Sequence, residues 1–128
     1  MRPDDLLAIA EKRKMYVVVR SDLPPGLRAA QAAHAVAEAC LRLHAATHWH
    51  DDPEGNYLII LEVPNQEALL DSFAMVKSWG VPRELFREPD LRYDATAFAA
   101  LPRVGQNHIF SHLPLAYSKR RWWPRFRR

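Results

Sequence analysis

A continuous apolar run near the N-terminus, MYVVV (15–19), constrains the fold more than any other stretch of this sequence. Successive β-branched residues favour a strand, and the absence of polar alternation indicates a buried one. A second run of the same kind, NYLIILEVP (56–64), ends at Pro64. The sequence therefore predicts a sheet with at least two buried strands.

Helical composition lies between and after these two runs. Alanine dominates from Leu27 to about His44, which predicts a first helix. A second helix is predicted over residues 66–79, where Asn65 is a suitable N-cap and Gly80 a suitable C-terminal residue. The apolar stripe of this second helix consists of Leu69, Leu70, Phe73, Met75 and Val76.

The remaining segments predict short strands and loops. Residues 81–87 read as a third strand, and residues 95–101 and 107–113 as a strand pair joined by a turn that contains Gly105. Two polar stretches rich in turn-forming residues are expected to be loops: HWHDDPEGN (48–56) and EPDLRYDAT (88–96).

The order of these elements predicts an α/β fold. Strands that alternate with helices imply crossover connections, so we expect a three-layer arrangement with a mixed four-stranded sheet flanked by helices. The sheet is expected to be mostly parallel with one antiparallel strand. A length of 128 residues fits one domain. We expect an N-terminal helical extension over 1–13, an α/β domain over 14–117 and a basic aromatic tail over 118–128.

The charge of the chain is unevenly distributed. The last ten residues hold six of the 18 Lys and Arg residues and no acid, which leaves 12 basic and 15 acidic residues in the rest. The body is therefore mildly acidic, and the tail produces the pI of about 9.3. A single cysteine, Cys40, excludes an internal disulfide. No signal peptide or membrane span is apparent, so a cytoplasmic protein is expected.

Two loops are expected to follow strand ends, where ligands usually bind in α/β sheets. They are RSDLPPG (20–26) and REPDLRYDAT (87–96). The spacing of Leu27, Gln31, His34 and Glu38 places them along one stripe of the first helix, beginning where free backbone N–H groups favour an anion. A binding role requires Gln31 and His34 to line an exposed edge. The alternative is that both only complete the packing.

The stretch YVVVRSDLPPGLRAAQAAHA resembles the beginning of class II peptidyl-tRNA hydrolases, the archaeal and eukaryotic type. In that family a strand precedes Arg-x-Asp-Leu, a Gly-Lys loop and Ala-Ala-Gln-x-x-His-Ala on the first helix. The similarity extends through NYLIILEVPNQEALLDSF and KSWGVPRELFREPD and covers roughly residues 14–117. It implies hydrolysis of the ester between a peptidyl, or aminoacyl-type, group and tRNA.

The resemblance also implies the site. The residues that match family positions for catalysis are Gln31, His34, Asp90 and Thr96, and those expected to bind substrate are Arg20, Asp22, Gly26 and Arg28. Asp94 is a second candidate for the role of Asp90.

The sequence departs from the family pattern in both loops. Leu27 stands where the family has a lysine, and Leu91 follows Asp90 where the family has a glycine. Arg28 stays charged and offers a planar fork for phosphate or an oxyanion, but it is equally expected as a solvated side chain. A non-catalytic RNA- or protein-binding module of the same fold is therefore the alternative function.

The tail KRRWWPRFRR interleaves cations with aromatic residues, which suits a phosphate backbone with unstacked bases. An anionic membrane surface, its own acidic body and a disordered end are the alternatives. The expected partners are tRNA and, through the tail, the ribosome or other RNA; the family resemblance admits a homodimer, but the sequence leaves the oligomeric state open. The residues expected to bind nucleic acid are Lys119, Arg120, Arg121, Trp122, Trp123 and Arg125.

A polar cluster around the end of the first helix contains potential metal ligands, but a surface loop explains it better than a zinc site. No metal and no cofactor are expected. The cluster consists of His44, His48, His50, Asp51 and Asp52.

Overall fold

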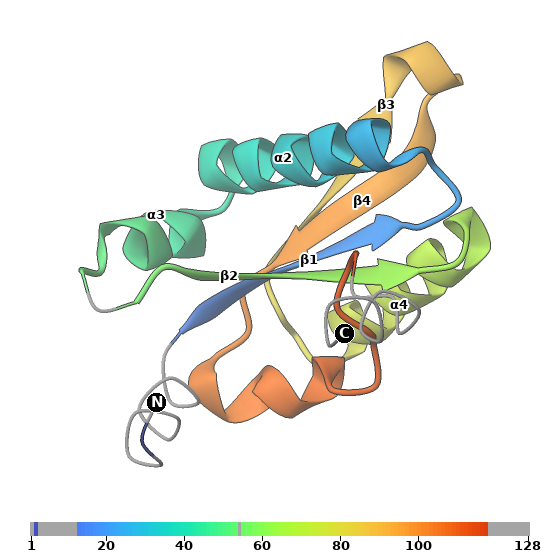
Figure 1. Cartoon of the computed structure of the whole chain (residues 1–128). Coiled ribbons are helices and arrows are strands. Elements are labelled where there is room, and N and C mark those ends of the chain that lie inside the picture. Colours follow the sequence, from blue (N-terminus) through green and yellow to red (C-terminus); the bar gives the residue numbers. More distant parts are fainter. Residues whose placement is uncertain (1, 3–12, 54, 118–128) are drawn as a thin grey trace.

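The computed structural model describes residues 2, 13–53 and 55–117, and it contains one four-stranded sheet (Figure 1). The strands are β1 (Lys14–Arg20), β2 (Tyr57–Val63), β3 (Arg83–Glu88) and β4 (Asp94–Ala100), in the spatial order β2-β1-β4-β3. The tail and all of the expected N-terminal helical extension except residues 2 and 13 fall outside the described residues.

The four-stranded mixed sheet is confirmed, but the expectation of a mostly parallel sheet is wrong. Strand β4 runs against the other three strands, and it lies between β1 and β3. Since β4 is an inner strand, its reversed direction affects two pairings: both β1–β4 and β4–β3 are antiparallel. The remaining pair, β1–β2, is parallel. Only five residues separate β3 from β4, a connection that suits antiparallel neighbours.

Helices cover both faces of this sheet and complete three layers (Figure 1). Helices α2 (Pro25–Arg42) and α3 (His44–Asp51) lie on one face, while α4 (Gln66–Ser78) and the 3₁₀-helix η2 (Val104–Phe110) lie on the other. The alternating side chains of β1 serve two cores: Met15, Val17 and Val19 face α2, whereas Tyr16 and Val18 face α4 and η2. The unbroken apolar run of β1 therefore reflects burial on both sides.

Two expected elements are wrong. Residues 48–51, expected as the beginning of a loop, belong instead to α3, in which Ala46 and Trp49 pack on the sheet between polar neighbours. The second half of the expected strand pair, residues 107–113, overlaps η2 instead. There Ile109 and Phe110 are buried side by side, an arrangement that a strand's alternation does not give.

The capping expectations for α4 are confirmed. The Asn65 side chain accepts a hydrogen bond from the Ala68 amide at 2.9 Å, and Gly80 follows the helix at a φ of +69°. In the part of the chain that the structure describes, no helix has the length and apolarity to cross a membrane.

Candidate active site

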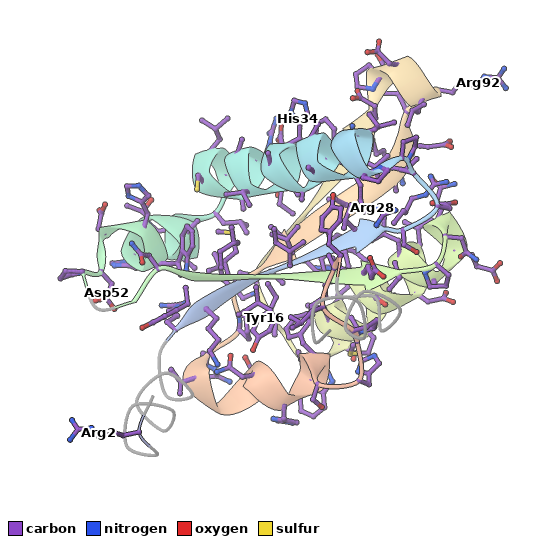
Figure 2. The ribbon with its side chains drawn as sticks, in the orientation of Figure 1. Arg2, Tyr16, Arg28, His34, Asp52 and Arg92 are labelled. Carbon is purple, nitrogen blue, oxygen red and sulfur yellow. The ribbon has the colours of Figure 1, made fainter. Side chains whose placement is uncertain are left out.

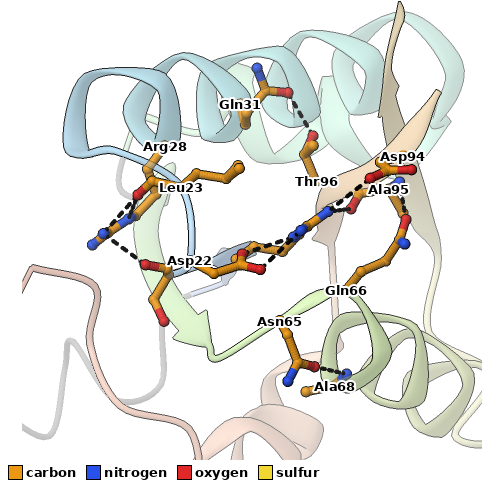
Figure 3. A network of polar contacts seen from close by, with 12 residues as sticks. Asp22, Leu23, Arg28, Gln31, Asn65, Gln66, Ala68, Asp94, Ala95 and Thr96 are labelled. Carbon is orange, nitrogen blue, oxygen red and sulfur yellow. Dashed lines mark hydrogen bonds and ion pairs between the residues drawn. The ribbon is translucent and has the colours of Figure 1, made fainter. Parts of the chain in front are cut away.

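The carboxyl end of β1 is tied to the beginning of β4 by Arg20. Its guanidinium binds both oxygens of Asp22 at 2.9 Å and donates to the Ala95 carbonyl oxygen at 3.2 Å. The Asp94 carboxylate lies 3.7 Å from Arg20 Nη1, on the same side of the guanidinium as Ala95 (Figure 3). The hydrogen bonds that Arg20 donates lower the pKa of the Asp22 carboxyl below its ordinary value, and the same hydrogen bonds raise the pKa of Arg20. Asp94, the second candidate for the role of Asp90, is therefore engaged by Arg20.

Arg28 is directed into the protein, unlike either state expected from the sequence. The side chain is 6% exposed, and its Nη2 donates to the carbonyl oxygens of Ser21 and Leu23 at 2.9 Å each. Its Nη1 also lies 3.5 Å from Glu62 Oε2 on β2. The expected phosphate contact and the solvated state both require an outward side chain, whereas this one organises the β1–α2 loop (residues 21–24) from beneath.

Gln31 joins α2 to the end of β3 and to β4. Its Nε2 donates to Glu88 Oε1 at 3.0 Å, and its Oε1 accepts from the Thr96 hydroxyl at 2.6 Å. Gln31 and Thr96 are both 0% exposed. The expectation that Gln31 lines an exposed edge is therefore wrong, and both side chains act from behind the surface.

A β-bulge explains how Thr96 reaches Gln31. Phe86 pairs with Ala97 and the next residue, Arg87, with Ala95, so Thr96 is the extra residue of β4. Alternation is broken at this point: Thr96 reaches α2, and the adjacent Ala97 packs in the core on the same side. The hydroxyl group thus enters a face that otherwise carries small apolar side chains.

His34 and Asp90 are the exposed members of the expected catalytic set. The imidazole of His34 stacks on the Phe86 ring with centroids 4.6 Å apart. Figure 2 shows His34 on the outer side of α2, whereas Arg28 lies between α2 and the strands. Asp90 is exposed in the short 3₁₀-helix η1 (Pro89–Leu91), two residues after Glu88. No hydrogen bond or ion pair within the described ranges engages its carboxylate.

The turn after Asp90 forms without the family's glycine. Arg92 and Tyr93 adopt left-handed conformations with φ of 58° and 61° and lead directly into β4. Two L residues in this region carry backbone strain, which is common in segments that serve a site.

The helix beginning at Pro25 has no side-chain cap and no acidic residue in its first turn, so its amides are compatible with an anion. Gly26 lies exposed in that turn.

Three supporting residues are absent from the sequence-based set. Glu88 holds Gln31, Glu62 pairs with Arg28, and Gln66 accepts a 2.6 Å hydrogen bond from the Ala95 amide at the beginning of β4. The position of Glu88 next to the loop that carries Asp90 is the one feature of the sequence that points to a role for Glu88 in the site. Glu62 and Gln66 lie far from both motifs in the sequence, so spacing does not point to them.

The histidine cluster lies at the other end of α2. His44 and His48 approach with their Nε2 atoms 3.1 Å apart, and His50 Nδ1 is 3.1 Å from Asp51. Among the described residues no group of three or more His, Cys, Asp and Glu is arranged to hold a metal ion. A shallow depression of about 300 Å³ beside this cluster is lined by Cys40 and residues of α3. It is separate from the polar network around Gln31.

Comparison with known proteins supports the fold and the family. The solved structure of a protein of unknown function from Agrobacterium tumefaciens is similar with a TM-score of 0.59 and 15% identity, covering 81% of this chain and 97% of that one. No protein with a curated description matches the sequence. The family described as Peptidyl-tRNA hydrolase PTH2 matches residues 13–102, which contain both loops and the whole sheet. The chain therefore belongs to the peptidyl-tRNA hydrolase PTH2 family.

Proposed function

We propose that this protein hydrolyses the ester that links a peptidyl, or aminoacyl-type, group to the 3′ end of tRNA. The observation that carries the proposal is the hydrogen-bond chain from Thr96 through Gln31 to Glu88. It connects the residues of the family's helix and strand motifs and holds the segment that carries Asp90 against α2. Membership of the family supplies the substrate class.

The exposure of each residue suggests its role in this reaction. Asp90 is exposed and has no hydrogen-bond or ion-pair partner among the described residues, so its carboxylate is the group suited to orient and deprotonate the attacking water. His34 is exposed on the neighbouring helix and is suited to contact the substrate. Gln31 and Thr96 are positioning residues, because neither side chain reaches solvent.

The developing oxyanion of the tetrahedral intermediate requires hydrogen-bond donors. The uncapped first turn of α2, around Gly26, offers backbone amides, and Arg28 holds the preceding loop through the carbonyls of Ser21 and Leu23. Arg20 acts similarly on the second side, since it fixes Asp22, Asp94 and the Ala95 carbonyl relative to one another. Both arginines thus shape the site rather than react.

The direct test is the release of labelled peptide from N-acetylated aminoacyl-tRNA by the purified full-length protein. Asp90→Asn is expected to lower kcat/KM by about 10²-fold or more, because it removes the base while keeping a similar shape. The matched control is Asp71→Asn, an exposed carboxylate on α4, on the opposite face of the sheet. Equal rates for Asp90→Asn and wild type would contradict the assignment.

A second candidate, non-catalytic binding of the tRNA end, is favoured by one observation. The family's loop lysine is Leu27 here, and the adjacent Arg28 is buried beneath the loop. Under this alternative the wild type binds tRNA but releases no peptide. Leu27→Lys in the full-length chain then restores measurable release, whereas under the first proposal the wild type is already active.

A further inference from the structure

The chain between β3 and β4 places two arginines and a tyrosine on the surface next to Asp90. Arg87 is the last residue but one of β3, and Arg92 and Tyr93 directly follow η1. All three residues are exposed. At 64% exposure, Tyr93 is second only to Leu41 among the large hydrophobic residues that the structure describes. We call Arg87, Arg92 and Tyr93 the β3–β4 surface.

Hydrogen bonds hold this surface in a defined shape. The Tyr93 amide donates to the Glu88 carbonyl oxygen at 2.9 Å, which closes the chain across η1. Arg87 Nη1 donates to the Tyr93 carbonyl oxygen at 3.2 Å, so its guanidinium group lies against the same turn. The Glu88 side chain is in turn held by Gln31 of α2. A surface that is already ordered loses little conformational entropy when a ligand binds.

The backbone at Arg92 and Tyr93 is strained, although neither side chain is buried. Both residues are left-handed, with φ of 58° and 61°, a region that bulky L residues rarely adopt. Packing within the protein does not account for this conformation, because Arg92 points away from the body of the molecule (Figure 2) and most of the Tyr93 side chain is exposed. Strain of this kind is typical of segments that bind a ligand.

Neither arginine of the β3–β4 surface is neutralised by an acid among the described residues. The hydrogen bond of Arg87 goes to a backbone carbonyl, and no ion pair in the described part of the chain joins Arg87 or Arg92 to a carboxylate. The nearby carboxylates of Glu88 and Asp94 are engaged by side chains of α2 and β1. Guanidinium N–H groups are therefore available for phosphate oxygens, which arginine binds through two parallel hydrogen bonds.

We infer that the β3–β4 surface binds the single-stranded 3′ end of tRNA, with the Tyr93 ring stacked on an unpaired base and Arg87 and Arg92 on neighbouring phosphates. The inference rests on the proposed function for the identity of the RNA. A single strand offers base faces and phosphates together, which matches one exposed ring with two guanidinium groups. An anionic membrane is a poorer match, because the carboxylates of Glu88 and Asp90 lie in the same connection. Since Asp90 is three residues before Tyr93, a strand end held here brings its ester to the proposed base.

The first test measures the binding of deacylated tRNA to the full-length protein over a range of salt concentrations. Arg92→Gln is expected to reduce the slope of log affinity against log salt by about 0.7, and Arg87→Gln/Arg92→Gln by about 1.4, because each arginine contacts one phosphate of a single strand. The double variant is also expected to bind at least about tenfold more weakly. Lys77→Gln, at an exposed cation on α4, is the control and leaves both quantities unchanged. Wild-type affinity and slope in the double variant would overturn the inference.

The second test separates the aromatic ring from the charges. Tyr93→Asn removes the ring but tolerates the left-handed backbone, whereas Tyr93→Phe keeps a stacking face. Tyr93→Asn is expected to bind intact tRNA about fivefold or more weakly at an unchanged salt slope, and Tyr93→Phe to bind like wild type. Tyr57→Ala, at an exposed tyrosine at the beginning of β2, is the control.

A tRNA that lacks its single-stranded 3′ end shows whether the ring acts at that end. Wild type and Tyr93→Asn are expected to bind this shortened tRNA equally. Equal binding of intact tRNA by the two proteins would overturn the inference. The same loss of affinity for intact and shortened tRNA would also overturn it, because the ring would then contact another part of the molecule.

The two proposals fail separately. If wild-type protein releases no peptide but both binding results hold, the β3–β4 surface stands and the hydrolase proposal fails. If peptide is released but the double arginine variant and Tyr93→Asn bind tRNA normally, the hydrolase proposal stands and the surface inference fails. Loss of binding to phosphatidylserine vesicles in the double variant, with tRNA binding unchanged, would identify a membrane surface as the partner and overturn the inference.

Discussion

Thr96 contributes both to the stability of the fold and to the hydrogen-bond chain on which the proposed function rests. Its hydroxyl donates at 2.6 Å to a glutamine that solvent does not reach, so neither partner has water as a substitute. Thr96→Val retains the shape but leaves Gln31 Oε1 without its donor. An unsatisfied buried acceptor costs about 1–3 kcal/mol, and the free energy of unfolding is expected to fall by that amount.

Urea denaturation followed by circular dichroism measures this change. Thr96→Ser restores the donor and is expected to recover most of the loss. Thr47→Val serves as the control, because Thr47 is exposed on α3. A Thr96→Val protein as stable as the control would mean that the hydrogen bond contributes nothing.

Asp22 provides a prediction that depends on pH. Its pKa in the folded protein is lowered from 3.8, chiefly by the hydrogen bond from Arg20. The pair therefore stabilises the folded state above about pH 4, and this contribution is lost as the pH falls through the folded-state pKa. Because the Asp22 side chain is 38% exposed, the expected contribution is about 0.5–1 kcal/mol.

The comparison of Asp22→Asn with wild type isolates that contribution. At pH 7 the variant is expected to unfold at lower urea concentration, and at pH 2.5 the difference is expected to shrink toward zero. Asp71→Asn gives the corresponding curve for an exposed carboxylate that has no partner in the described part of the chain. A stability difference for Asp22→Asn that does not change between these pH values would rule out the Arg20 pair as its source.

At the scale of elements, the alanines of α2 allow it to lie close to β4. Ala32, Ala35 and Ala39 share a core with Ala97 and Ala99, so small side chains face one another across the contact. Ala35→Leu inserts three carbon atoms where no space exists, and about 1–3 kcal/mol of stability is expected to be lost. Ala37→Leu is the control on the exposed side of the same helix. The thermal unfolding midpoints of the two variants distinguish the buried from the exposed position. Equal midpoints would mean that α2 shifts away from the sheet without loss of stability to accommodate the larger side chain.

The sequence predicts those elements whose own residues carry the signal. The apolar runs of β1 and β2 and the caps of α4 can be predicted, because residues adjacent in the sequence determine them. The sequence does not predict helix α3, because only Ala46 and Trp49 of its eight residues are buried. The bulge at Thr96 is set by the partner strand β3, so β4 alone gives no indication of it.

At the scale of the molecule, the site depends on contacts between distant segments. Gln31 and Glu88 are 57 residues apart, and Arg20 and the Ala95 carbonyl 75 apart. The family resemblance brings Gln31, Thr96 and Asp90 together as a set, but it does not say which are buried. Direction and exposure depend on packing that no local pattern records. For that reason the inward orientation of Gln31 and Arg28 emerges only from the structure.

The shared sheet predicts that the two cores unfold together. Strand β1 contributes alternate side chains to both cores. If one core is lost, β1 loses the packing on that face, and the other core depends on β1 as well. Leu69→Ala, in the core beneath α4, is expected to lower the free energy of unfolding by about 2–5 kcal/mol. Amide hydrogen exchange should show the same decrease in protection for α2 as for α4, since a small domain of this kind opens as one cooperative unit. If α4 amides lost protection while α2 amides kept theirs, the two faces would be independent units, and the hydrogen bonds across the sheet would not couple the site to the far core.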